Sequence, residues 1–427
     1  MSTARPRVVV VGAGIVGLCV AEALVRDGCA VSVVERGSHE RDGASFGNAG
    51  LIVPSHVVPL AAPGVLGQGV RWLLDPESPF TIRARLDLDL VRWGVTFARS
   101  ATARHVARSA PLLRDLHLRS KALHLDLAER LAPAPPAPRC AGALVVCRTE
   151  HAWAEEVALA RRAAELGLRA DVLDAAGVAE RVAGPEVRCV GGVHYLDDAH
   201  ASPRALMRAL QDHLVAVGVT FHWDADVVGF ERHGGRVVGA RLRDGDVVAG
   251  ERFVLAGGVA SARLARVLGA YVPMQAGRGY SVTVPDVGVP PALPLLLAEA
   301  RVAVTPLPEG VRVGGTMEIA DPARPVDPRR VRGIARSAER YLPGFAADRL
   351  ATLPVWTGAR PVSADGMPYL GPLRRAPEVV VAAGHGMMGF SLAPVTGALV
   401  ADLIAGRAFD PDLTALAPER FGGARGR

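Results

Sequence analysis

The sequence predicts an α/β fold in which a parallel-sheet domain is combined with a discontinuous α+β lobe built on an antiparallel sheet. The chain opens with a strand–helix–strand pattern over 7–35, and short buried strands recur at 252–256 and 379–383. At 427 residues it is long enough for two domains. Segments that alternate as in an antiparallel sheet lie at 277–284, 301–307 and 311–320.

A glycine motif follows the first strand. Gly12, Gly14 and Gly17 come after the buried run Val8–Val11 in G-x-G-x-x-G spacing. The first glycine allows a tight turn, the second lets a pyrophosphate approach the backbone, and the third lets the next helix pack closely. Glu35 ends the second strand, where a carboxylate accepts both ribose hydroxyls. The pattern predicts a Rossmann-like domain that binds an adenine dinucleotide without a 2′-phosphate, and it does not separate FAD from NAD.

Composition excludes several classes of function. Half of the residues are hydrophobic, and the formal net charge of +6 comes from scattered arginines, so we expect no nucleic-acid partner. A mild attraction to anionic substrates or to an anionic membrane surface stays open. The longest apolar run, Val8–Ala21, is too short and too rich in glycine to span a bilayer.

Cysteine and lysine usage narrows the chemistry further. The five cysteines are odd in number and fit no metal-site spacing, which favours a reduced, cytoplasmic protein without a metal. Lys121 is the single lysine, in a helical and polar stretch, so Schiff-base chemistry has no good candidate. The apolar segments Leu60–Leu74 and Leu86–Phe97 either touch the inner face of a membrane or, as we favour, pack on the nucleotide-binding domain.

Motifs distributed along the chain carry a resemblance to a known family. The chain resembles the FAD-dependent oxidoreductases of the D-amino-acid oxidase type, and within them it is most similar to the D-amino-acid dehydrogenase small-subunit family. Glycine, sarcosine and proline-type oxidoreductases share much of the same set. The matching segments are VVVVGAGIVGLCVAEALVRDG, ASFGNAGLIVPS, DLDLVRWGVTFAR, GRGYSVTV, VGGTMEIA, GARPVSADGMPYLGP and GHGMMGFSLAP.

The resemblance implies a domain division and a set of residues around non-covalent FAD. FAD-binding parts are expected at 1–65, 186–270 and 356–427, and parts of the substrate lobe at 66–185 and 271–355. The helix after the glycine-rich turn 384–389 would direct its N-terminus at the pyrimidine end of the flavin. The implied cofactor-binding residues are Gly12, Gly14, Ile15, Val16, Gly17, Glu35, Arg36, Ser45, Asn48, Ala49, Gly50, Leu51, Val227, Ala256, Gly257, Arg360, Gly384, Gly386, Met387, Met388 and Gly389.

Four residues are candidates for the substrate site. Arg360 is the first choice to hold a substrate carboxylate, because a guanidinium binds it in bidentate fashion, and a structural salt bridge is the alternative. Tyr280 either adds a hydroxyl to that carboxylate or is an ordinary strand aromatic. His385 lies close to the flavin if the resemblance holds, or is a hydrogen-bonded structural histidine. His56, in the apolar loop 44–64, is a weaker candidate.

The expected reaction is oxidation of an amino acid, most readily a D-amino acid, at Cα. Hydride passes from Cα to flavin N5, the imine hydrolyses to a 2-oxo acid, and the electrons go to a quinone or another carrier. Two departures favour a dehydrogenase over an oxidase. No tyrosine occurs in Arg301–Pro306, where D-amino-acid oxidases carry one, and no lysine is available near the flavin.

Three alternatives remain beside this expectation. One is an oxidase of glycine, sarcosine or proline-type secondary amines, and another is a tailoring enzyme that oxidises an amine in a biosynthetic intermediate. The third is a non-catalytic FAD-containing subunit of a complex. The sequence does not specify the substrate side chain or the oligomeric state.

Overall fold

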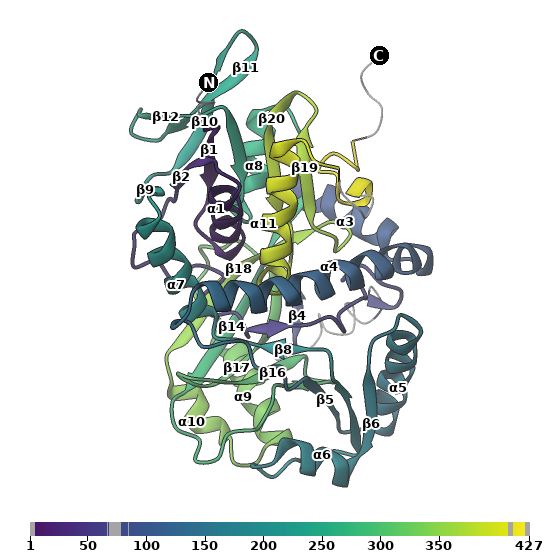
Figure 1. Cartoon of the computed structure of the whole chain (residues 1–427). Coiled ribbons are helices and arrows are strands. Elements are labelled where there is room, and N and C mark those ends of the chain that lie inside the picture. Colours follow the sequence, from purple (N-terminus) through teal and green to yellow (C-terminus); the bar gives the residue numbers. More distant parts are fainter. Residues whose placement is uncertain (1–4, 66, 68–77, 84, 409–412, 423–427) are drawn as a thin grey trace.

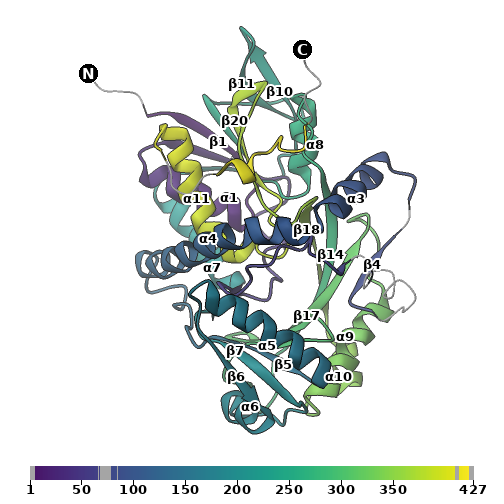
Figure 2. The same cartoon turned by 90° about the vertical axis from the view of Figure 1, so that its right-hand side faces the viewer.

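The computed structural model describes residues 5–65, 67, 78–83, 85–408 and 413–422. Two layers of sheet are stacked along the long axis, and the helix α4 (Ala103–Arg130) crosses between them (Figure 1). Turned by 90°, the molecule shows α11 (Gly389–Ala405) above α4 and α5 (Glu150–Glu165) below it (Figure 2). Most of the apolar segment Leu60–Leu74 lies outside the described residues.

The upper layer is a sheet that is parallel except for its edge strand β19. Its first strand lies in the middle and pairs with β2 on one side and β13 on the other, through valines that are almost fully buried. Runs of buried β-branched residues favour such a central parallel strand. The order is β19 (Tyr369–Leu373), β20 (Ala376–Ala383), β13 (Arg252–Leu255), β1 (Arg7–Val11), β2 (Ala30–Val34) and β9 (Thr220–His222).

Helices pack on this sheet and on one another at very short range. A Cβ added at Gly397 of α11 would lie 2.4 Å from the carbonyl oxygen of Cys19 in α1 (Ile15–Arg26), so a glycine is needed where the two helices cross. Ser202 caps α7 (Pro203–Ala216) by accepting a hydrogen bond from the Ala205 amide, as the sequence predicts. α8 (Ala260–Val267) and the predicted meander β10 (Val227–His233), β11 (Arg236–Leu242) and β12 (Val247–Ala249) complete this layer.

The lower layer is a mixed sheet rather than the purely antiparallel one expected from the sequence. β15 pairs with β5 in parallel, and the short strand β4 (Phe80–Ile82) pairs with β17 in parallel. The partner of a strand is not visible in local patterning, which explains the difference. The order is β18 (Val355–Ser363), β14 (Met274–Val284), β17 (Gly310–Ile319), β16 (Val302–Leu307), β15 (Leu295–Leu297), β5 (Ala143–Cys147), β7 (Gly191–Tyr195) and β6 (Ala170–Asp174).

Further elements cover this layer and join it to the upper one. The helical region expected over Leu86–Leu131 consists of two helices, because Asp87 and Thr102 each cap a new helix N-terminus. Part of the expected apolar loop pairs as β3 (Leu51–Ile52) with β8 (Ala199–His200). The remaining elements are α3 (Leu88–Ser100), α6 (Ala175–Val182), α9 (Pro328–Tyr341), α10 (Ala347–Thr352) and the 3₁₀ turn η1 (Leu413–Leu416).

Candidate active site

The carboxyl ends of four parallel strands bring the predicted cofactor-binding residues to one edge of the upper sheet. Gly12 follows β1, Glu35 follows β2, Ala256 follows β13 and Gly384 follows β20. Ligands of open α/β sheets bind at this edge. The structure therefore gathers segments that are far apart in the sequence at the place where a dinucleotide is expected.

The glycine motif is enforced by backbone contact. Gly12 has φ +110°, and a Cβ there would lie 2.7 Å from the Ala256 carbonyl oxygen. A Cβ at Gly17 would lie only 1.9 Å from the carbonyl oxygen of Gly12. Gly14 occupies the N-cap of α1 without a capping side chain of its own, and the Ser45 hydroxyl accepts the Ile15 amide at 3.1 Å. The arrangement leaves a helix N-terminus suited to a pyrophosphate.

Glu35 is held rigidly at the end of β2. Its two carboxylate oxygens accept the amides of Ala13 at 2.7 Å and Gly37 at 2.9 Å. Arg36 beside it is exposed. The sequence reading missed Arg41, whose guanidinium donates to the Ala13 carbonyl at 2.7 Å and lies 4.5 Å from the centre of the Trp223 ring. Burial lowers the pKa of Arg41, and its only sequence signal was its place in the polar turn 36–43.

The segment from Ser45 to Leu51 is fixed from the lower sheet. Buried Arg312 on β17 donates to the carbonyl oxygens of Phe46 at 3.1 Å and Asn48 at 2.8 Å. The Asn48 side chain accepts the Gly50 amide at 2.8 Å, and half-buried Ala49 lies between them. At the far end of the predicted site, the carbonyl of Val227 accepts a hydrogen bond from the Arg263 guanidinium at 3.1 Å.

The turn 384–389 connects the two layers directly. Gly384 and Gly386 have φ +80° and +56°, a conformation that favours glycine. The Gly386 amide donates to the Pro361 carbonyl at 2.8 Å, and His385 forms an isolated bridge with Val362. Met388 caps α11, while Met387 is 49% exposed and Gly389 begins the helix. The N-terminus of α11 therefore lies beside the end of β18, which carries Arg360.

Arg360 occupies a face of the lower sheet that glycines leave bare. It pairs with Gly277 across the β14–β18 ladder, and a Cβ at Gly279 would lie 2.2 Å from its Nη2. Its Nη1 donates to the Thr316 carbonyl at 2.7 Å. Thr316 has φ +67° and lies where the β14–β17 register shifts, so an irregular backbone directs this carbonyl to the guanidinium.

The charge of Arg360 is not neutralised by the described part of the chain. Among the described residues, no carboxylate lies within ion-pair distance of its guanidinium. Burial lowers the pKa of Arg360 to about 10, so the group remains cationic at neutral pH. Arg360 is half-buried, and a cation partly withdrawn from water without an anionic partner is a candidate place for an anionic ligand group.

Tyr280 is not brought together with Arg360. Directly paired residues of an antiparallel ladder share a face, and Tyr280 pairs with Thr357, an odd number of residues from Arg360. Its hydroxyl donates to Glu318 at 2.6 Å within the core under α9. Burial, followed by this bond to Glu318, raises the pKa of the Tyr280 phenol to about 12. Tyr280 could contact the carboxylate that Arg360 is expected to bind only if its side chain lay on the opposite face of the sheet.

Comparison with known proteins identifies the family. The model of a family described as FAD dependent oxidoreductase (DAO) matches residues 7–403. The chain belongs to this family of FAD-dependent oxidoreductases. It is 31% identical to a protein named D-amino acid dehydrogenase from Rhodopseudomonas palustris over 423 residues, covering 96% of both chains. A relative of the same name from Granulibacter bethesdensis is 31% identical over 433 residues, covering 98% of this chain and 100% of the relative.

Solved structures share the fold of this oxidoreductase. Glycine oxidase from Geobacillus kaustophilus superposes with a TM-score of 0.76 at 21% identity, over 97% of this chain and 99% of that one. L-proline dehydrogenase from P. horikoshii gives a TM-score of 0.71 at 19% identity, over 99% of both chains. FAD fits the residues present here, because the helix N-terminus at Gly14 and the acid at Glu35 suit its pyrophosphate and ribose.

Two histidines predicted for the oxidoreductase site have lowered pKa values; His385 is buried and His56 is half-buried. Nε2 of His385 lies 3.0 Å from the Thr396 hydroxyl, and burial lowers the pKa of His385 to about 4. Nδ1 of His56 lies 3.3 Å from the Ser55 hydroxyl, which donates to buried Asp198 at 2.6 Å. Burial, and then the charge of Arg301, lower the pKa of His56 to about 4. Burial raises the pKa of Asp198 to about 7, against the hydrogen bonds from Ser55.

A polar row on α4 was not recognised from the sequence. Nδ1 of His117 lies 2.8 Å from the Ser391 hydroxyl, Ser120 donates to the Ser391 carbonyl at 2.6 Å, and His124 lies 3.1 Å from the Phe390 carbonyl. These groups bind the first turn of α11 just behind the turn 384–389. Their spacing of three and four residues, on a stripe that is otherwise apolar, was the available signal.

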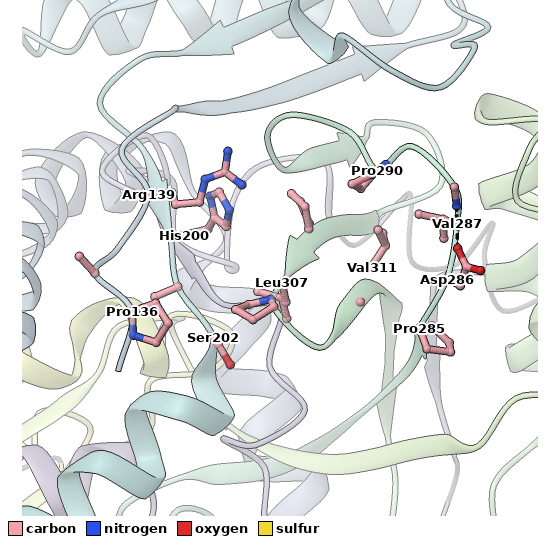
Figure 3. A pocket seen from close by; sticks show the side chains of 16 residues that line it. Pro136, Arg139, His200, Ser202, Pro285, Asp286, Val287, Pro290, Leu307 and Val311 are labelled. Atoms are coloured by element: carbon pink, nitrogen blue, oxygen red, sulfur yellow. Dashed lines mark hydrogen bonds between the residues drawn. The ribbon is translucent and has the colours of Figure 1, made fainter. Parts of the chain in front are cut away.

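Three further observations delimit the site. Among the described residues, no group of three or more histidines, cysteines or acids is placed to hold a metal ion. A cavity of about 390 Å³ lies elsewhere, between the segments 136–139, 285–290 and 306–311 (Figure 3). Within the described helices, none is long and apolar enough to cross a membrane.

Proposed function

We propose that this chain is an amino-acid dehydrogenase that oxidises D-amino acids at Cα to 2-oxo acids and passes the electrons to an acceptor other than oxygen. The observation that supports it best is Arg360, a half-buried cation on the bare face of the lower sheet beside the turn 384–389. The names of the relatives at 31% identity agree with this substrate class.

In this proposal each part of the chain has a defined task. Arg360 binds the substrate carboxylate in bidentate fashion and so fixes the position of Cα. FAD, when bound, supplies the hydride acceptor. The N-terminus of α11 stabilises negative charge that develops at the pyrimidine end of the ring. His385 holds the turn through Thr396, and this assigns it a positioning role rather than proton transfer.

His56 is the proposed partner of the substrate amine. Half-buried His56 has a pKa lowered to about 4, so its imidazole stays neutral at physiological pH and can accept a hydrogen bond from the substrate amine, without being basic enough to take its proton. Ser55 and Asp198 orient the ring through the contacts at 3.3 and 2.6 Å. Substitution of Ser55 by alanine tests this role, because loss of the orienting contact would shift the acid limb of the kcat/KM profile. An unchanged profile would assign the chain Asp198–Ser55–His56 to structure alone.

The test of the proposed function is anaerobic mixing of the purified holoprotein with D- and L-amino acids, sarcosine, glycine and D-proline. Flavin absorbance at about 450 nm reports the reaction directly, because under anaerobic conditions it falls only when a substrate reduces the ring. We expect bleaching by D-amino acids and slow recovery in air. Bleaching by glycine or sarcosine with rapid peroxide formation would indicate an oxidase, and no bleaching by any compound would contradict the proposal.

A peripheral contact with an anionic membrane is proposed for α3. Leu88, Val91 and Val95 form one stripe on this helix and are 73%, 59% and 46% exposed, and Arg92 and Arg99 beside them are exposed as well. An apolar stripe flanked by cations suits an anionic lipid surface, where a lipid-soluble quinone would be available. Co-sedimentation with anionic vesicles should be lost in Val91→Glu, and binding unaffected by this change would contradict the proposal.

A further inference from the structure

The cavity of about 390 Å³ is separate from the proposed substrate site. Arg360 pairs with Gly277 near the start of β14, whereas the cavity begins at Pro285, just beyond the end of that strand. Eight residues of extended strand span about 25 Å. A ligand in the cavity therefore cannot be the one that Arg360 orients.

The walls of the cavity are stiff. Five of the lining residues are prolines, whose rings fix the backbone of three of the four contributing segments; the fourth, 200–202, carries no proline. Gly310 in the β16–β17 turn has φ +125°, and a Cβ there would lie 2.3 Å from the Val284 carbonyl oxygen. The prolines seen around the cavity in Figure 3 are Pro136, Pro285 and Pro290, with Pro306 and Pro308 completing the set.

One end of the cavity carries polar groups that are poorly satisfied. His200 is 2% exposed, and neither ring nitrogen has a hydrogen-bond partner of good geometry among the described residues, although the Pro306 backbone lies close enough to raise its pKa slightly. Buried polar atoms of native proteins are almost always paired, so this orphaned ring requires an explanation. Arg139 lies beside it (Figure 3) and is exposed, with a hydrogen bond to the Ala292 carbonyl that is long at 3.4 Å. Burial, and then the charge of Arg139, lower the pKa of His200 to about 4.

The acidic side chains around the cavity are already engaged. Glu309 accepts a hydrogen bond from Arg312 at 3.1 Å and from the Ser202 hydroxyl at 3.1 Å. Asp286 caps its own turn by accepting the Gly288 amide at 3.0 Å. Neither carboxylate is recorded as a partner of Arg139 or His200. The guanidinium of Arg139 and the neutral imidazole of His200 therefore lie together at one end of the cavity.

We propose that this cavity binds a small carboxylic acid with an apolar body, its carboxylate held between Arg139 and His200 and its body against the prolines. Arg139 is long and exposed, so its guanidinium can turn from the imidazole to admit the carboxylate. Amino acids and 2-oxo acids share this chemistry, and the choice between them as the natural ligand rests on the proposed function. A product bound here would report its concentration to the enzyme at a distance from the reaction.

The experiment is calorimetric titration of FAD-loaded protein with 4-methyl-2-oxopentanoate, D-leucine and 4-methylpentanoate. The background is Arg360→Met, which removes the other carboxylate site. We expect one binding event that survives in Arg360→Met and weakens at least tenfold on adding Arg139→Gln or His200→Phe. The matched control is Arg188→Gln, an exposed arginine paired with Glu186 outside the cavity.

The three ligands distinguish the sources. Binding of 4-methyl-2-oxopentanoate alone would identify the product class, and binding of D-leucine alone would identify the substrate. Binding of 4-methylpentanoate as well would show that only the carboxylate and the apolar body are recognised. A shift of the His200 ring signal in NMR spectra, absent from His200→Phe, should accompany binding and places the ligand beside the ring. No heat in Arg360→Met, or heat indifferent to Arg139 and His200, would overturn the proposal. Flavin bleaching is measured separately, so failure of the proposed reaction remains distinguishable.

Discussion

The two faces of the β14–β18 ladder contrast sharply. On one face, Glu318 accepts hydrogen bonds from Tyr280 at 2.6 Å and Arg83 at 2.7 Å, and Arg278 lies 3.5 Å from the same carboxylate. On the other face, Arg360 stands over glycines with a backbone carbonyl as its described partner. The same strands therefore carry a cluster of charges neutralised within the protein and a cation that is not.

This difference separates structural from functional charge. Breaking a buried pair leaves an uncompensated ion, so the Glu318 cluster contributes to stability only while it is complete. A cation that the described fold does not neutralise contributes nothing comparable to stability, and we propose that a ligand explains its retention. Both kinds of arginine look alike in the sequence, in which arginine is almost the only cation.

The largest effect is expected from Arg360→Met. Removal of the guanidinium should lower kcat/KM by about 1,000-fold, or about 4 kcal/mol, because a substrate carboxylate loses a charge-assisted bidentate contact. Stability and FAD content should be retained, since an apolar side chain replaces an unpaired ion. Steady-state kinetics with an artificial electron acceptor and thermal unfolding measure the two quantities. A variant that is clearly less stable but keeps its kcat/KM would place Arg360 with the structural charges.

On the other face of the ladder, Glu318→Gln should have the opposite effect and lower stability rather than kcat/KM. It removes the charge that compensates Arg83 and Arg278, and should lower the free energy of unfolding by about 3 kcal/mol. Denaturant unfolding checks this, with Glu251→Gln at an exposed pair as the control that should change by less than about 0.5 kcal/mol. A catalytic defect in a fully stable Glu318→Gln protein would erase the distinction between the faces.

Tyr280→Phe sharpens the comparison with a smaller change. Only the hydroxyl that donates to Glu318 is lost, so stability should fall by about 1 kcal/mol or slightly more. kcat/KM should change by less than about threefold, because the side chain lies on the face away from Arg360. A drop in kcat/KM comparable with that of Arg360→Met would restore the carboxylate-binding role predicted from the sequence.

The smallest expected effect is a difference in how acid pH changes the stability of the two regions, the histidines near the turn 384–389 and the cluster around Glu318. Burial lowers the pKa of His117 to about 3 and of His385 to about 4, against about 6.5 in an unfolded chain. Their stabilising contribution is therefore present above about pH 6.5 and is lost as the pH falls towards 4. The hydrogen bonds and arginines around Glu318 hold its pKa low, so that cluster persists until below about pH 4.3.

Thermal release of FAD, followed by flavin fluorescence, measures this difference. The release temperature should decline between pH 6.5 and 4.5, and His117→Gln should flatten the decline by a few degrees at most. Glu318→Gln should leave its slope unchanged over that range. A slope that depends on Glu318 rather than on the histidines would reverse the assignment.

Local signals made the cofactor end of the fold predictable. The run Val8–Val11, the glycine spacing and Glu35 each dictate one local geometry. The family resemblance suggested roles for Arg360 and the turn 384–389, which the structure brings close together and which stay predictions. The sequence did not reveal which face of β14 carries Tyr280, because the strand is buried on both faces and its periodicity is hidden. It also missed Arg41, whose role depends on contacts with Ala13 and Trp223 from distant segments.

The mixed pairing of the lower sheet escaped prediction for a related reason. β7 and β18 belong to this sheet, yet they come from parts of the chain that the sequence placed mainly with the nucleotide-binding domain. Strand pairing over hundreds of residues is decided by packing and not by composition. The domain division at 1–65, 66–185, 186–270, 271–355 and 356–427 therefore remains a proposal.

The link between Gly386 and Pro361 has an evolutionary consequence. In the proposed site, this one backbone hydrogen bond joins the turn 384–389 to the strand that bears Arg360, so the position of a bound carboxylate relative to the flavin would not depend on the rest of the pocket. Side chains on β15 and β16 can be substituted without changing the hydrogen bond between Gly386 and Pro361. A single scaffold can thereby diversify into enzymes for small, cyclic or bulky amines while the geometry of the reacting carbon is inherited unchanged.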